Sequence, residues 1–110
     1  MRRGRVRRRS GKLELALRDH TRAIELKPRQ ANYHLERGLT YYANQQFNRA
    51  ITDFSTVISL DPRHALGFAR RADSLRKVGR REEAFRDYSR ALELQPDAAD
   101  LRIRRGILCL

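Results

Sequence analysis

The sequence repeats itself at an interval of 34 residues. The stretches ALRDHTRAIELKP, AITDFSTVISLDP and AFRDYSRALELQP occupy residues 16–28, 50–62 and 84–96. Each stretch places an alanine, an aspartate, a ring, a second small apolar residue and a closing proline at the same steps. A recurrence of this length is typical of proteins that stack similar units, because one unit cannot bury its apolar face alone. We therefore expect a stack of repeated units.

The apolar residues within each copy have the spacing of an α-helix. They fall at offsets 0, 1, 4, 7 and 8 from the opening alanine, which places them on one helix face. Proline removes a backbone donor, clashes with the preceding turn and disfavours helical geometry in the residue before it. We therefore predict an amphipathic helix in each copy that ends just before Pro28, Pro62 or Pro96.

The segments between the copies repeat as well. Residues 31–47 and 65–81 align position by position, and the same columns continue in 99–110. Each segment is predicted to form a first helix, which a short turn joins to the copy that follows. The expected turns lie at Gly11, at Asn44-Gln45 and at Gly79. The unit is thus helix, turn, helix, proline.

This unit resembles the tetratricopeptide repeat. The matching features are the turn, the second-helix alanine and ring, the closing proline, and the small first-helix residues Gly4, Gly38, Ala72 and Gly106. The resemblance covers nearly the whole chain and implies an all-α fold, a right-handed α-solenoid of antiparallel helix pairs, in one domain over 1–110. We expect it to comprise a partial repeat with a basic start (1–30), two full repeats (31–64 and 65–98) and the first helix of a further repeat (99–110).

The outer repeats depart most from the family pattern. His20 stands in the ring column of the opening unit, and Arg102 stands where the first helix usually has a tryptophan-like residue. We therefore expect the two ends of the solenoid to be less well packed than its middle.

The resemblance also implies a binding surface, because the first helices of such proteins line a concave groove that receives a peptide or a helix. The residues expected to contact a partner are Asn32, Leu35, Leu39, Tyr42, Leu66, Ala69, Asp73, Arg76, Ile103 and Ile107. Two interpretations stay open: an apolar groove for a partner segment, or apolar residues that pack between neighbouring first helices.

One subset of the family clamps the C-terminal carboxylate of chaperones with lysine, asparagine and arginine. Leu35 and Leu39 stand where that clamp needs lysine and asparagine. Binding of acidic chaperone tails is therefore not expected.

Two columns of charge follow the repeat. Arginine recurs at positions 3, 37, 71 and 105, and aspartate at 19, 53 and 87. The arginines either cover apolar surface and reach water or nearby carboxylates, or form a basic ladder for an acidic ligand. The aspartates are expected to be solvated on the helix face, with Arg22 and Arg90 in reach at helical spacing.

The positive charge is concentrated at the start of the chain. The net charge is +12, and residues 1–12 hold six arginines and one lysine without an acid, which gives +7. This segment has three interpretations: the first helix of a repeat, a basic arm for nucleic acid or nuclear import, or the start of an organellar transit peptide. Binding of nucleic acid or an anionic surface is thus the alternative to binding a protein.

No enzyme, cofactor or metal site is predicted. The three histidines lack the spacing of metal ligands, and the sequence has no glycine-rich phosphate loop. Its one cysteine fits a reducing compartment, so we expect an intracellular protein, cytoplasmic with the nucleus as the alternative. No secretory signal or apolar run long enough for a membrane span occurs.

The final segment, LRIRRGILCL, is an apolar first helix without a second helix to cover it. Solenoids usually close with a polar cap. We therefore expect either a piece of a longer repeat protein or a chain that associates with itself through this helix.

Overall fold

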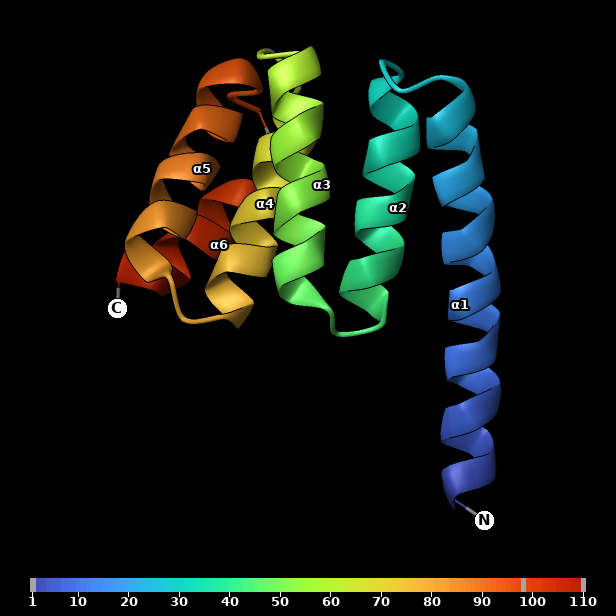
Figure 1. The fold of residues 1–110 in the computed structure, drawn as a ribbon. Helices are drawn as coiled ribbons and strands as arrows, with labels where there is room; N and C mark the ends of the chain where they lie inside the picture. The colour runs from blue at the N-terminus through green and yellow to red at the C-terminus, as the bar shows by residue number, and fades with distance from the viewer. Residues whose placement is uncertain (1, 98, 110) are drawn as a thin grey trace.

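The computed structural model describes the backbone of residues 2–97 and 99–109, and the side chains of 12–97 and 101–106. This part of the chain is all-α and contains no strand. Its helices are α1 (Arg2–Leu26), α2 (Ala31–Ala43), α3 (Phe47–Leu60), α4 (Ala65–Lys77), α5 (Arg81–Leu94) and α6 (Ala99–Cys109) (Figure 1). Pro28, Pro62 and Pro96 all lie in turns between helices, as the sequence predicts.

The helices stack in chain order as antiparallel neighbours. The pairs α2–α3 and α4–α5 pack closely, α3 contacts α4, and α2 contacts α4 across the stack. In the view of Figure 1, α4 and α6 lie behind α3 and α5, so the first and second helices form two layers in this part of the stack. The predicted α-solenoid of helix pairs is confirmed.

Two of the three predicted turns are present, each with a residue in the left-handed region. Gln45 has a φ of 61° and Gly79 a φ of 84°. At Gly79 the amide of Arg80 donates to the carbonyl of Leu75 at 2.9 Å, which closes the end of α4. These turns reverse the chain and make each helix pair antiparallel.

The prediction of a turn at Gly11 is wrong. α1 runs through Gly11 as one helix of 25 residues, and its first half extends beyond all the other helices (Figure 1). A glycine inside a helix costs about 1 kcal/mol relative to alanine, which weakens the helix without ending it. The opening unit therefore lacks a first helix folded back on its second helix.

The core lies inside the two complete pairs. Phe54 of α3 is fully buried with Leu35, Ala50 and Val57. A Cβ atom at Gly38 of α2 would stand only 2.6 Å from the Phe54 ring, so the ring needs a glycine opposite it. In the next pair, Tyr88 and Ala72 occupy the corresponding positions, also fully buried.

The opening unit is less well packed than the middle of the solenoid, as predicted. In α1 the residues of the apolar stripe are only half-buried, whereas their counterparts in α3 and α5 are mostly buried. The half-buried residues are Ala16, Leu17, His20, Ala23 and Ile24.

Replacing Phe54 by alanine should lower the free energy of unfolding by about 3–5 kcal/mol, because the substitution leaves a cavity in a closed core. Denaturant unfolding followed by circular dichroism measures this loss. Phe85 on the outer side of α5 is a matched control, since its ring is partly exposed and its loss should cost well under half as much. A loss below about 1 kcal/mol at Phe54 would contradict this account of the core.

Candidate functional site

The residues predicted to bind a partner lie on the first helices, but several of them are buried. Leu35 is 8% exposed and Ala69 is 3% exposed, and each belongs to the core cluster of its own helix pair. Both side chains are buried within these clusters, so they offer little surface to a partner. For these two residues, the structure therefore agrees with the second interpretation given above, in which apolar residues of the predicted face pack inside the protein.

Other predicted residues remain in reach of solvent. Leu66 is 44% exposed and Ile103 is 65% exposed. Asn32 is exposed as well, and Leu39, Tyr42 and Arg76 are half-buried. The side chain of Ile107 lies outside the described residues. The accessible part of the predicted face therefore runs over α2 and α4 to α6.

Asp73 is the hub of a hydrogen-bonded network and does not face solvent. It is buried in α4, and the hydroxyl of Tyr88 in α5 donates to its Oδ1. Arg104 of α6 reaches Oδ2 at 3.0 Å, and Arg70 reaches the same atom at 3.5 Å. Burial, and then the bond to Asp73, raise the pKa of Tyr88, so its hydroxyl stays protonated and donates. The network joins α4, α5 and α6.

Arginines that the sequence analysis did not select surround this network. Arg70 and Arg104 line a small hollow of about 100 Å³ between α4 and α6, with Leu66 at its wall. Among the described side chains, the Nε atoms of Arg70 and Arg76 are buried without a hydrogen-bond partner. Positions 70 and 104 are one repeat apart, and that recurrence is the signal that could have identified them. The face is therefore cationic as well as apolar.

The arginine and aspartate columns pair with each other across each complete helix pair. Arg37 binds Asp53 through two hydrogen bonds of 2.8 and 2.7 Å, and Arg71 binds Asp87 through two of 2.6 and 2.9 Å. Each arginine also reaches a hydroxyl of the preceding second helix, that of Thr21 or Ser55. The bond to Asp53 raises the pKa of Arg37.

The expectation of solvated aspartates is thus wrong for the inner repeats. Asp53 is 2% exposed and Asp87 is 6% exposed, whereas Asp19 is exposed. Arg90, expected to lie near Asp87, binds Glu93 instead. Burial of the carboxylates is possible because each one is held by a bidentate arginine. The inner arginines are therefore structural and do not form a ladder for an acidic ligand.

The histidines contribute to the fold. The Nδ1 atom of His64 accepts the amide of Gly67 at 2.9 Å and caps α4. The Nε2 atom of His34 donates to the carbonyl of Pro28 at 2.7 Å. No cluster of metal ligands occurs among the described residues.

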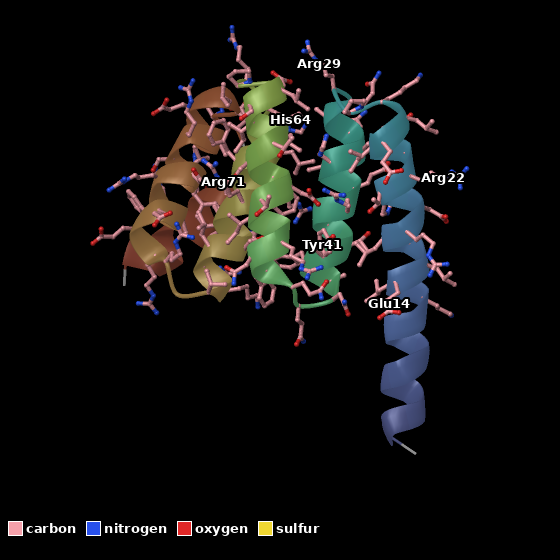
Figure 2. All side chains as sticks on the ribbon, in the orientation of Figure 1. Glu14, Arg22, Arg29, Tyr41, His64 and Arg71 are labelled. Atoms are coloured by element: carbon pink, nitrogen blue, oxygen red, sulfur yellow. The ribbon has the colours of Figure 1, made fainter. Side chains whose placement is uncertain are left out.

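A wider groove of about 670 Å³ lies between α1 and the turn after α2. Glu14 and Arg22 line it from α1, and Tyr41 lines it from α2 (Figure 2). Its lining mixes both signs of charge. No helix in the described part of the chain is long and apolar enough to cross a membrane.

The helix pairs, the turns and the buried ring of each pair define the class of the protein as an α-solenoid repeat domain. The model of the tetratricopeptide repeat matches residues 31–64 and 65–98, and a related TPR repeat model matches residues 4–45. The chain belongs to the tetratricopeptide repeat family. It is a protein–protein interaction module.

Curated relatives support this membership. The chain is 32% identical over 91 residues to serine/threonine-protein phosphatase 5 of Rattus norvegicus, covering 83% of this chain and 18% of the relative. It is 29% identical over 92 residues to small glutamine-rich tetratricopeptide repeat-containing protein 2 of Saccharomyces cerevisiae, covering 84% of this chain and 27% of that protein. The chain thus spans well under a third of either relative.

Solved structures show the same fold. The first TPR of Spaghetti (RPAP3) bound to the HSP90 peptide SRMEEVD has a TM-score of 0.87 at 23% identity, covering 91% of this chain and 79% of that one. The second TPR domain of human RPAP3, in complex with the HSP70 peptide SGPTIEEVD, has a TM-score of 0.85 at 27% identity, covering 98% and 90%.

Replacing Asp53 by asparagine should lower the free energy of unfolding by about 3 kcal/mol, because it leaves the charge of Arg37 half-buried without a partner. Asp19→Asn is the matched control, since it changes the same repeat column where the carboxylate is exposed, and should cost less than about 0.5 kcal/mol. Thermal and urea unfolding measure both. Equal losses at the two positions would contradict the structural role of the buried pair.

Proposed function

We propose that the chain binds an extended or helical segment of another protein along the face formed by α2, α4 and α6. No catalytic step is part of the proposal, and the activity of the phosphatase relative is not carried over, because the match covers 18% of that protein. The HSP70 peptide complex of the 27% identical neighbour supports a peptide as the class of ligand.

The observation that carries the proposal is that neighbouring first helices keep accessible apolar side chains. Leu39 and Tyr42 of α2 are half-buried, and Leu66 of α4 is 44% exposed. The ring of Tyr42 is held edge-on against Phe47, with 5.2 Å between the ring centroids. A partner that covers these apolar side chains removes them from water, and this burial contributes favourably to the free energy of binding.

The arginines next to Leu66 favour a partner segment that also carries an acid. Arg70 and Arg104 border the hollow beside Leu66, and they share the single carboxylate of Asp73. Among the described side chains, their two positive charges are therefore only partly balanced. An acidic side chain on the partner, near its apolar residues, would neutralise the remaining positive charge and fix the position of the bound segment along the face.

The clamp for a terminal carboxylate is not part of the proposal. Leu35 is buried, and Leu39 supplies no polar atom to such a group. We therefore infer recognition of an internal segment by apolar contacts with an acidic contact beside them.

Binding of nucleic acid through residues 1–12, and an intracellular location in cytoplasm or nucleus, stay predictions. No contact among the described side chains favours nucleic acid. The salt dependence of binding separates the two functions, because phosphate binding weakens steeply with ionic strength.

A displayed library of random peptides, selected on the 110-residue chain, tests the proposal. Selected peptides should combine aliphatic or aromatic residues with an acid. The double variant Leu39→Asp with Leu66→Asp should lower their affinity by about 30-fold or more, because it places charge where apolar surface is covered. Fluorescence anisotropy measures the change.

Leu26→Asp is the matched control, since Leu26 is an exposed leucine at the end of α1, and it should leave affinity unchanged. Peptides that bind the double variant as well as the original chain would contradict the proposed face. Binding that is lost at high salt and is unchanged by the double variant and by Leu26→Asp would support the nucleic-acid alternative.

A further inference from the structure

Each complete helix pair is held by the same two-part contact, which we call the pairing site. In the first pair, Arg37 and Gly38 stand side by side on α2. Arg37 holds the carboxylate of Asp53, and Gly38 receives the ring of Phe54 from α3. An adjacent arginine and small residue on the first helix thus bind an adjacent aspartate and ring on the second helix.

The second pair repeats the pairing site one interval later. Arg71 of α4 holds Asp87 of α5, and Ala72 lies opposite the ring of Tyr88. All of these residues except the arginine are buried. The contact is therefore a recurring recognition element between a first and a second helix.

α6 carries the same pairing site, but the described part of the chain does not fill it. The Nη1 atom of Arg105 donates to Ser89 Oγ at 3.4 Å, as Arg71 does to Ser55, but Arg105 holds no carboxylate among the described side chains. A Cβ atom on Gly106 would meet nothing within 4 Å. Ile103 is largely exposed where the corresponding Leu35 is buried.

α1 carries the complementary half without its first helix. Asp19 and His20 occupy the aspartate and ring columns. Asp19 is exposed and makes no ion pair among the described side chains, whereas Asp53 and Asp87 are buried. Because α1 continues straight past Gly11, no helix of the described chain folds back onto this side of residues 16–24 (Figure 1).

We propose that α6 of one copy packs against α1 of a second copy and completes a helix pair between them. Arg105 of one copy would hold Asp19 of the second copy, and Gly106 would lie opposite its His20. Ile103 would be covered by the apolar stripe of the second copy's α1, as Leu35 is covered by α3. The unfilled pairing residues of α6 and those of α1 occupy the same columns of the 34-residue repeat. The second copy would therefore continue the solenoid in register.

The charges and the geometry of the ends favour this occupant. Within the described side chains, Arg105 is half-buried and bonds a serine but no carboxylate, and the exposed Asp19 in the matching column bonds no arginine. The two surfaces are different, so the contact is head-to-tail and can propagate into short chains. It lies at the ends of the stack and leaves the face of α2 and α4 free.

Sedimentation velocity on the 110-residue chain over a wide concentration range tests the proposal. The original chain should associate as concentration rises. Arg105→Asp and Asp19→Arg should each weaken association by about tenfold or more, because each places like charges in contact. Arg63→Asp, in the exposed turn before α4, is the matched control and should change nothing.

Mixing the two single variants gives the sharpest result. The α6 surface of the Arg105→Asp chain should bind the α1 surface of the Asp19→Arg chain, and the unchanged α6 and α1 surfaces of the two variants should bind each other as well. The mixture should therefore associate by alternating the two variants, although each variant alone associates weakly. Circular dichroism of each variant verifies that it remains folded.

Three outcomes would overturn the proposal. The first is an original chain that stays monomeric at the highest attainable concentration. The second is association that neither charge substitution weakens. The third is a mixture of the two variants that forms no complex, which would show that any association uses other surfaces.

Discussion

The fold depends on one contact that recurs between a first and a second helix: an aromatic ring on a small residue, with a bidentate arginine–aspartate pair beside it. The ring of Phe54 fits only because Gly38 has no side chain, and the buried carboxylate of Asp53 is tolerable only because Arg37 neutralises it. Together they fix the separation and the rotation of the two helices. Repeated every 34 residues, the contact determines the direction of the stack.

This contact also determines which side chains are left for binding. It uses one side of α2 and α4, and the core includes Leu35 and Ala69 as well. What remains accessible is a set of apolar residues on α2 and α4, with arginines beside Leu66 that share the carboxylate of Asp73. A face of this kind suits a segment with apolar residues and an acid, whereas the incomplete contacts at α1 and α6 suit another helix pair. Joining copies would use Ile103 and Arg105 of α6, and binding a partner would use α2, α4 and the Arg104 side of the same helix.

Much of the fold could be predicted because it follows from period and position along the chain. The 3.6-residue spacing indicates the helices, proline marks their ends, and the repeat columns identify Phe54 and Tyr88 as core residues. The pairing of Arg37 with Asp53 could not be predicted. The two residues are 16 positions apart and lie on different helices, and only packing sets the rotation of one helix relative to the other. The prediction of a turn at Gly11 failed for a related reason. A glycine permits both a turn and a continuing helix, and no local signal selects between them. Asp73 was expected on the binding face because its spacing places it opposite the core stripe of α4. The structure buries it instead, with a tyrosine from α5 and an arginine from α6 as its hydrogen-bond donors.

The central claim is that stability follows the completeness of helix pairs, and native-state amide hydrogen exchange measured residue by residue tests it most directly. Protection should be highest in α3, α4 and α5, lower in α6, and lowest in the first half of α1, which has no neighbour in the stack. Equal protection along the whole chain, or strong protection of the first half of α1 in dilute solution, would contradict the claim.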